Sequence, residues 1–267
     1  MPVILSNTKD SVNSDYFIFV PAYNVENTLA EVLFKIEESV LSRAHVLVID
    51  DGSHDGTVQA FENFVKSFLC DVSKNACVME NARDLSSHFE YLKFEQNSGY
   101  GAVVKKGIAE GLALGAKYIA CLHGDGQYPA EKLREFFDEM ERRNLDLLQG
   151  SRHAVVGEAK RGGMPLYKRV GGAFLTALEN AAFRVKLTDR HSGFIAYSSR
   201  FLKTVNLNRL SPSFDIDLEL ISIADARGFN LAELPIPTRY AGEKSNLNVV
   251  NYGLRVLRQI WRRFCAR

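Results

Sequence analysis

Apolar residues fill consecutive positions in several short stretches of the chain, and each stretch ends in a polar turn. The clearest is residues 118–122, YIACL, which lead directly into the turn His123-Gly-Asp125-Gly-Gln127. Unbroken apolar runs of this length are typical of strands that are covered on both faces, as in parallel α/β sheets. Further strands are predicted at 15–20, 44–49, 89–94, 145–150 and 192–197.

Between the first strands the apolar residues recur every three or four positions, which is the spacing of one helix face. Five rounds of strand and helix predict an α/β fold with a mostly parallel, doubly wound sheet flanked by helices. Three glycines at 107, 111 and 115 weaken one predicted helix, and close packing on the sheet is the expected reason. The helices are predicted at 26–40, 57–68, 101–115 and 130–143, and the polar residues 69–88 are predicted to form an enlarged loop.

The pattern changes beyond Ser151, where a basic, glycine-rich loop at 155–165 replaces the regular alternation. Helices are predicted at 166–183 and 214–227, and the two prolines of the extended segment 230–240 suit a sheet edge. No linker composition separates the two halves. We therefore predict one domain over 1–240, with halves at 15–150 and 151–240, followed by a tail at 241–267.

Composition narrows the classes of function. The chain has 33 basic and 32 acidic residues, so bulk charge gives no support to nucleic-acid binding. The four cysteines lack metal-ligand spacing, and Cys121 in a predicted core strand suits a reduced cytosolic thiol. The first residues do not have the pattern of a signal peptide, and no run of about 18 apolar residues predicts a membrane span.

Acidic residues follow two of the predicted strands. Asp50 and Asp51 end one strand and Asp125 follows another. Ligands of open α/β sheets bind beyond the carboxyl ends of the strands, and carboxylates there can hold a divalent cation and ribose hydroxyls. The alternative for Asp125 is a polar turn that caps the helix beginning near Pro129.

Two other motifs are weaker. Residues 51–62 have the acidic spacing of a calcium-binding EF-hand loop, but that loop must follow a helix and a β-branched strand precedes it here. Gly99-Tyr-Gly101 resembles the start of a dinucleotide-binding fingerprint, but Val104 occupies the third glycine position. No phosphate-binding P-loop and no G-x-S-x-G elbow is present.

Six motifs carry a resemblance to a known family. In order they are VPAYNVENTL (20–29), VLVIDDGSHDGT (46–57), NSGYGAVVKKG (97–107), LHGDGQYP (122–129), LTDRHSGFIAY (187–197) and IPTRYAGEKSNLN (236–248). On these motifs the chain resembles a family 2 glycosyltransferase with the GT-A fold. More narrowly, it is similar to the polyprenol-phosphate (dolichol-phosphate) mannosyl- and glucosyltransferases.

The resemblance implies a site for a nucleotide-sugar donor in the first half. Asp50 is expected to hold the base or ribose, with Asp51 close by. The residues implied to contact the nucleotide are Pro21, Ala22, Tyr23, Glu26, Asp50, Asp51, Gly101 and Lys105.

The resemblance also implies a divalent metal cofactor, Mg²⁺ or Mn²⁺. In the family's Asp-x-Asp motif the second carboxylate coordinates the metal, a role that falls on Asp125, followed by Gln127. The first acidic position holds His123, a departure from the family pattern. Imidazole binds Mn²⁺ but is a poor ligand for Mg²⁺. The alternative for His123 is a hydrogen-bonded histidine at the sheet edge.

The second half is implied to receive the acceptor. Asp189 matches an acidic residue near the acceptor in the family, and its alternative role is a turn or helix cap. Arg239 and Lys244 match a basic pair that faces the phosphates, whereas Lys160, Arg161 and Arg169 are weaker candidates. Family members invert the anomeric configuration. A saccharide hydroxyl acceptor would need a carboxylate base, Asp189 or Asp217, whereas a lipid phosphate is already anionic.

The tail is predicted to form a basic amphipathic helix. Its apolar residues Val250, Leu254, Leu257, Trp261 and Phe264 share one face, and four arginines lie largely elsewhere. Such a helix is typical of membrane-surface binding, and docking on the domain through the same stripe is the alternative.

The sequence therefore predicts an inverting, metal-dependent transferase that moves a hexose from a UDP- or GDP-sugar to a polyprenyl phosphate. The expected location is cytoplasmic, peripheral on the cytosolic face of a membrane, with no nucleic-acid partner. Transfer to a saccharide hydroxyl in envelope polysaccharide synthesis is a second interpretation. A non-catalytic sugar-nucleotide binder is a third, motivated by His123.

Overall fold

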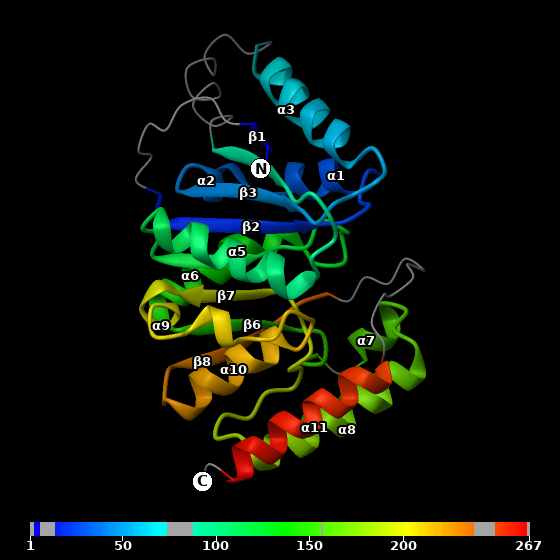
Figure 1. Cartoon of the computed structure of the whole chain (residues 1–267), viewed down its shortest axis with the longest axis vertical. Helices are drawn as coiled ribbons and strands as arrows, with labels where there is room; N and C mark the ends of the chain where they lie inside the picture. Colours follow the sequence, from blue (N-terminus) through cyan, green and yellow to red (C-terminus); the bar gives the residue numbers. More distant parts are fainter. Residues whose placement is uncertain (1–2, 6–13, 74–87, 156, 238–248, 266–267) are drawn as a thin grey trace.

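The fold is built on one eight-stranded sheet in a computed structural model that describes residues 3–5, 14–73, 88–155, 157–237 and 249–265. Six strands run in one direction, and β1 and β7 run against them. The spatial order is β1 (Val3–Leu5), β4 (Phe89–Lys93), β3 (Ala44–Asp50), β2 (Tyr16–Ala22), β5 (Tyr118–Cys121), β7 (Ile195–Ser198), β6 (Leu147–Ser151) and β8 (Leu231–Pro235) (Figure 1).

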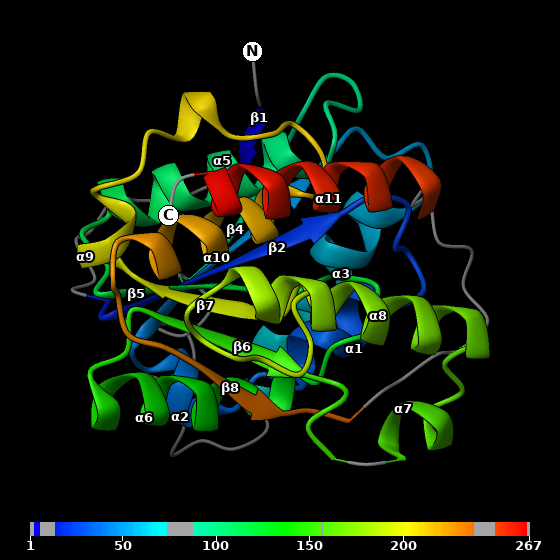
Figure 2. The same cartoon turned by 90° about the horizontal axis from the view of Figure 1, so that it is seen from below.

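Helices cover both faces of the sheet, and Figure 2 shows the two layers with the strands between them. Alternate residues of β2 belong to the two cores, since Ile18 packs into one and Phe19 into the other, as the two-residue period of a strand requires. One layer contains α1 (Leu29–Phe34), α2 (Glu38–Leu41), α3 (Thr57–Ser73) and α6 (Leu133–Arg143), and the other contains α5 (Tyr100–Ala113), α9 (Ser199–Leu202) and α10 (Ile216–Ala226).

The remaining helices are α7 (Glu158–Arg161), α8 (Leu166–Ala182) and α11 (Val249–Cys265), with short 3₁₀ turns η1 (Ala130–Lys132) and η2 (Leu207–Arg209). α8 and α11 pack on each other around a small third core that includes Phe183, Val256 and Ile260.

The predicted strands are confirmed in place, and the sheet is mostly parallel as expected. The direction of residues 195–198 could not be predicted: β7 enters antiparallel between β5 and β6. β8 lies at the sheet edge, as its prolines predicted, and ends at Pro235. Most of the predicted 69–88 loop lies outside the described residues, and the loop at 155–165 contains the short helix α7.

The predicted helix at 26–40 is instead two short helices. Its first residues are held against the turn after β3, because the Val25 amide donates to Thr57 Oγ1 (2.9 Å) and the Glu26 amide donates to Asp55 Oδ2 (3.2 Å). The helix therefore begins at Leu29. These long-range hydrogen bonds, rather than the local spacing of apolar residues, determine where the helix begins.

The glycines of α5 allow the close packing that the sequence predicted. A Cβ on Gly107 would lie 2.3 Å from the Phe19 ring, and one on Gly111 would lie 2.8 Å from Phe17. Gly115 has a different role, because its φ of +82° ends the helix in the left-handed conformation that glycine tolerates.

Candidate active site

The carboxyl ends of β2, β3 and β5 meet at one edge of the sheet. Ala22 pairs with Asp50 in the β2–β3 ladder, so these strands end level. The turn after β5 is tied to the end of β2, since the Gly124 amide donates to the Pro21 carbonyl (3.0 Å). Pro21, Ala22, Asp50, Asp51 and Asp125 are therefore gathered at one edge, where the sequence predicted a ligand.

Asp50 is fully buried and fully hydrogen-bonded within the protein. Its Oδ1 accepts from the Ser53 amide (2.7 Å) and hydroxyl (2.5 Å), and its Oδ2 accepts from the Tyr91 hydroxyl (2.6 Å). The Lys93 ammonium lies 3.4 Å from the same oxygen. Asp50 thus holds together the turn after β3 and the end of β4.

Asp51 ties the same turn to the beginning of α5. Its two oxygens accept from the amides of Ser98 (2.7 Å) and Gly99 (3.0 Å). Burial raises the pKa of Asp51 despite the opposing effect of these two amides. Next to it, a Cβ on Gly52 would lie 2.7 Å from the Gln96 carbonyl carbon, and its φ is +77°, so the position requires glycine.

The other residues of the expected nucleotide site differ in how open they are. Tyr23 presents a ring that is 37% exposed, and the Glu26 carboxylate accepts from the Gly56 amide (2.7 Å). Gly101 and Lys105 are not in the turn cluster. Gly101 donates its amide to the Pro212 carbonyl (3.1 Å), and Lys105 donates to the Leu210 carbonyl (2.5 Å).

The turn after β5 is less tightly satisfied. Asp125 is half-buried, and its Oδ1 accepts from the Gln127 amide (3.0 Å), whereas its Oδ2 has no hydrogen-bond partner among the described residues. Gly126 has a φ of +77° and lets the chain reverse at this point. Asp125 therefore keeps one carboxylate oxygen for a ligand.

His123 begins a partly buried polar network that the sequence did not reveal. Its Nε2 lies 3.2 Å from the Tyr100 hydroxyl, which donates to Asp217 Oδ2 (2.9 Å). The Tyr197 hydroxyl donates to Asp217 Oδ1 at 3.5 Å. Burial lowers the pKa of His123, which keeps the imidazole neutral, and burial raises the pKa of Asp217 to about 7.

A second charged cluster lies where β6 ends and the chain approaches β7. Arg152 follows β6 directly and binds Asp189 with two nitrogens, Nε to Oδ2 at 2.7 Å and Nη2 to Oδ1 at 3.1 Å. The His191 amide also donates to Asp189 Oδ1 (3.0 Å). Burial alone would raise the pKa of Asp189, but the charge and hydrogen bonds of Arg152 lower it well below its usual range. Arg152 was missed by the sequence analysis, and its place directly after a strand was the available signal.

Glu179 of α8 lies next to His191 and, unlike Asp189, is protonated near neutral pH. Its side chain is fully buried, neither oxygen has a hydrogen-bond donor in the described structure, and His191 Nε2 lies 3.4 Å away. Burial raises the pKa of Glu179 to about 8 and lowers that of His191 to about 4. Burial outweighs the opposing charge of Arg190 on Glu179 and of Asp189 on His191, so both side chains are neutral between these pH values.

The chain is similar to known proteins over most of its length. Residues 17–205 match glycosyl transferase family 2. The chain belongs to that family. It is 26% identical over 224 residues to the UDP-N-acetylglucosamine–dolichyl-phosphate N-acetylglucosaminyltransferase of Methanococcus voltae, covering 84% of this chain and 85% of the relative. It is 24% identical over 220 residues to the polyprenol monophosphomannose synthase of Mycolicibacterium smegmatis, covering 82% and 75%.

The solved structures confirm the GT-A fold. Glucosyl-3-phosphoglycerate synthase from Mycobacterium tuberculosis, in complex with Mn²⁺, UDP and glucosyl-3-phosphoglycerate, superimposes with a TM-score of 0.62 at 15% identity, covering 96% of this chain and 81% of that one. The family, the fold and the relatives together show that the chain is a glycosyltransferase.

The side chains of this glycosyltransferase fit a divalent cation only as a partial shell. Asp125 offers an open carboxylate oxygen, and His123 and Gln127 lie in the same turn. Within the described ranges no group of three or more His, Cys, Asp or Glu could hold a metal ion. Such a shell fits a cation whose remaining ligands come from a diphosphate and water.

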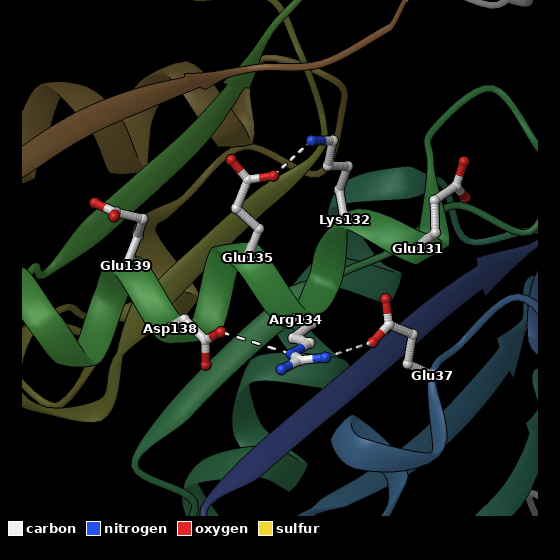
Figure 3. Close-up of a pocket in the computed structure, with 7 residues that line it drawn as sticks. All are labelled: Glu37, Glu131, Lys132, Arg134, Glu135, Asp138 and Glu139. Atoms are coloured by element: carbon white, nitrogen blue, oxygen red, sulfur yellow. Dashed lines mark hydrogen bonds and ion pairs between the residues drawn. The ribbon is translucent and has the colours of Figure 1, made fainter.

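The expected basic pair and the pocket found on the surface do not add to this site. Arg239 and Lys244 lie outside the described residues. A pocket on the outer side of α6 contains none of the predicted residues (Figure 3). It is lined by charged side chains that pair with each other, such as Arg134 with Glu37 (3.5 Å) and Lys132 with Glu135 (2.5 Å). This pocket is a solvated surface feature of the enzyme.

Proposed function

We propose that this glycosyltransferase transfers a hexose from a UDP- or GDP-sugar to a polyprenyl phosphate, with inversion and with Mn²⁺ or Mg²⁺. The observation that carries the proposal is the open carboxylate oxygen of Asp125, at the edge where β2 and β3 also end. The relatives named for dolichyl-phosphate and polyprenol substrates support the acceptor class. The nucleotide-binding half is then 15–150 and the acceptor half 151–240.

In this proposal the donor lies across the turns after β2, β3 and β5. The exposed Tyr23 ring is available to the base, and Asp50 and Asp51 keep the turn beside it rigid through their buried hydrogen bonds. A divalent cation held by Asp125 would neutralise charge on the departing nucleoside diphosphate. The acceptor oxygen attacks the anomeric carbon from the face opposite the diphosphate, so the C–O bond to the leaving group breaks and the configuration inverts.

The state of Asp189 favours a phosphate acceptor. A general base works best when its pKa is near the working pH. The ion pair with Arg152 lowers the pKa of Asp189 well below that range, so Asp189 is a weak base. A polyprenyl phosphate is anionic near neutral pH and requires positioning rather than deprotonation. Arg152 and the basic residues Arg239 and Lys244 are the candidates for that positioning.

One observation supports transfer to a saccharide hydroxyl instead. Asp217 has a pKa raised to about 7 by burial, which suits a general base. However, both of its oxygens accept from tyrosine hydroxyls and its side chain is buried. The lipid-phosphate acceptor remains our proposal because Asp217 has no open oxygen for a hydroxyl.

The deciding experiment measures transfer from radiolabelled UDP- and GDP-hexoses to undecaprenyl phosphate and dolichyl phosphate in detergent, with free saccharides as competing acceptors. A lipid-extractable product of inverted anomeric configuration supports the proposal. Product found only on a saccharide, with no lipid-linked sugar from any donor, contradicts it.

The α8–α11 pair supports contact with a membrane surface. Each helix carries an exposed apolar row: Leu166, Val170 and Phe174 are 66%, 60% and 62% exposed on α8, and Leu254 and Trp261 are 63% and 70% exposed on α11. Both views place α7, which precedes α8, on the side toward which β6 and β8 point (Figures 1 and 2). Among the described residues, no helix is long and apolar enough to cross a bilayer. Surface binding through these rows would bring the enzyme to a lipid acceptor.

The double variant Phe174→Ser/Trp261→Ser tests this surface. We expect the partition constant for vesicles of phosphatidylglycerol and phosphatidylcholine, measured by sedimentation, to fall about a hundredfold or more, because two large apolar side chains lose about 3 kcal/mol of lipid burial or more between them. Phe34, an exposed residue of α1, provides the control Phe34→Ser, which should sediment like the wild type. Equal sedimentation of all three proteins would rule out this surface as the lipid contact.

A further inference from the structure

His123 occupies the first acidic position of the family's Asp-x-Asp motif. Its imidazole and the buried carboxylate of Asp217 contact the same tyrosine hydroxyl. His123 Nε2 and Asp217 Oδ2 both contact the Tyr100 oxygen, at 3.2 Å and 2.9 Å. These residues come from the turn after β5, the first turn of α10 and the first residue of α5. No sequence motif connects them.

Counting protons along this network fixes the tautomer of the imidazole. Above its pKa of about 7 the Asp217 carboxylate is ionised and only accepts, so the single proton of the Tyr100 hydroxyl is then donated to Asp217. The Tyr197 hydroxyl lies 3.5 Å from the other oxygen of the same carboxylate, in a position to donate to it. The Tyr100 oxygen, which also lies 3.7 Å from Cys121 Sγ, then has no proton left for the imidazole and accepts from His123 Nε2. A neutral imidazole has one N–H, and its lone pair is therefore on Nδ1.

The ring is also fixed sterically. Tyr128 packs edge to face against His123, with centroids 4.9 Å apart and planes at 75°. On another side, a Cβ on Gly193 would lie 2.7 Å from Nε2, so a larger residue would displace the imidazole. Among the described residues, Nδ1 makes no hydrogen bond, and it is two positions along the chain from Asp125.

We propose that Tyr100 and Asp217 are positioning residues that hold His123 as the Nε2–H tautomer, so that Nδ1 is a nitrogen ligand and the cation site prefers Mn²⁺ over Mg²⁺. Mg²⁺ selects oxygen ligands, whereas imidazole nitrogen suits softer divalent ions. A partner that holds the second ring nitrogen of a ligating histidine is a recurring device for orienting it. This proposal rests on the proposed function in one respect, that a cation accompanies the donor diphosphate.

The first test needs neither metal nor turnover. Two-bond ¹H–¹⁵N correlation spectra of metal-free enzyme at pH 8 distinguish the tautomers, and His123→Gln identifies the His123 signals among the six histidines. We expect the Nε2–H form in the wild type and loss of that preference in Tyr100→Phe, which removes the acceptor. Tyr197→Phe removes the other donor to Asp217 without touching His123 and should leave the tautomer unchanged. A wild-type protein in the Nδ1–H form overturns the proposal.

The second test compares cations. Binding of Mn²⁺ and of Mg²⁺ is measured by thermal shift in the presence of UDP and, separately, of GDP, and Mn²⁺ binding is checked by electron paramagnetic resonance. Relative to His123→Asp, which restores an oxygen ligand, the wild type should prefer Mn²⁺ by a further tenfold or more. Tyr100→Phe should weaken Mn²⁺ binding by about tenfold, and Tyr197→Phe should match the wild type.

The outcomes separate the two proposals. Diphosphate binding that requires a cation but has the same Mn²⁺ to Mg²⁺ ratio in the wild type and His123→Asp overturns this inference and leaves the proposed function standing. Diphosphate binding that is independent of any cation contradicts the metal-dependent function itself. If Tyr100→Phe does not fold, the wild-type tautomer and the His123→Asp ratio still decide.

Discussion

The turn after β3 and the turn after β5 are alike in sequence but differ in how their carboxylates are occupied. Asp50 and Asp51 accept five hydrogen bonds from protein donors and are buried. Asp125 accepts one, from the Gln127 amide, and is half-buried. Both turns are acidic, contain glycine and end a central strand. The number of donors around each carboxylate, rather than its motif, separates a structural acid from one that is open to a ligand.

This difference has an energetic basis. A carboxylate whose lone pairs are all occupied contributes to stability and has little left to offer a ligand. A carboxylate with a free oxygen at the surface costs little to maintain and gains most when a cation arrives. Four substitutions test the distinction, taken here from the largest expected effect to the smallest.

Asp125→Asn should have the largest effect on catalysis and almost none on folding. Replacing the open oxygen's charge removes electrostatic stabilisation at the leaving group, which we expect to lower kcat/KM by about 10³-fold or more. The midpoint of thermal unfolding should stay within about 2 °C of the wild type, because among the described residues only the Gln127 amide donates to this side chain. Activity close to the wild type would refute the open-carboxylate assignment.

Asp50→Ala should show the opposite pattern. The variant leaves Tyr91 and Ser53 without their buried acceptor and removes the charge that faces Lys93, which keeps its hydrogen bond to the Ser53 carbonyl. Such losses destabilise proteins by about 3–5 kcal/mol. Urea unfolding monitored by circular dichroism measures the change. A loss below about 1 kcal/mol, with a loss of nucleotide binding instead, would show that Asp50 is mainly a ligand.

Glu179 is the third case, a buried carboxylate that has no hydrogen-bond donor in the described part of the chain, and it predicts a pH dependence. Burial raises its pKa to about 8, so the folded protein holds a proton that the unfolded chain, with a pKa near 4.5, has released. Stability therefore falls as the pH rises from about 4.5 to 8. From pH 5 to pH 9 the wild type should lose on the order of 3 kcal/mol relative to Glu179→Gln, since each pKa unit corresponds to about 1.4 kcal/mol.

Chemical denaturation at pH 5, 7 and 9 measures this difference. Glu31→Gln, at an exposed glutamate of α1, is the matched control and should retain the wild-type pH profile. Parallel pH profiles of the wild type and Glu179→Gln would mean that Glu179 is ionised in the folded protein.

Tyr91→Phe should have the smallest effect. It removes one of the donors to Asp50 and leaves the Ser53 hydrogen bonds and Lys93 in place, so we expect a loss of about 1–2 kcal/mol in the free energy of unfolding. Nucleotide binding should be unchanged. Additive losses in the double variant with Asp50→Ala would be unexpected, because the two side chains share one interaction.

The sequence was sufficient to predict the parts of the fold that depend on local pattern. Apolar runs placed β2, β3 and β5, and the rule that ligands lie beyond strand ends brought Asp50 and Asp125 to one edge. The occupancy of those carboxylates could not be predicted. The donors to Asp50 include Tyr91, 41 residues away, and Asp217 reaches Tyr100 across 117 residues. Spacing arguments do not describe contacts of that range.

The amphipathic helices show a related limit. The period of α8 predicted a helix, but a helix with several apolar positions does not reveal which of them face the protein. Val256 and Ile260 of α11 are buried in the third core, whereas Phe174 of α8 and Trp261 of α11 remain exposed. The choice depends on tertiary partners and so required the structure.

The reversed strand β7 has one further consequence. A strand that enters a sheet backwards delivers its beginning where its neighbours deliver their ends, so the segment before Ile195, with Asp189 and Gly193, arrives at the same rim as the turns after β2, β3 and β5. Under the proposed function, residues that follow β2, β3 and β5 would therefore bind the donor, and residues that precede β7 would bind the acceptor. Insertions between α8 and β7 would change the proposed acceptor-binding surface without changing the register of the strands whose ends would bind the donor. Such a chain could change its acceptor specificity while it keeps its donor specificity.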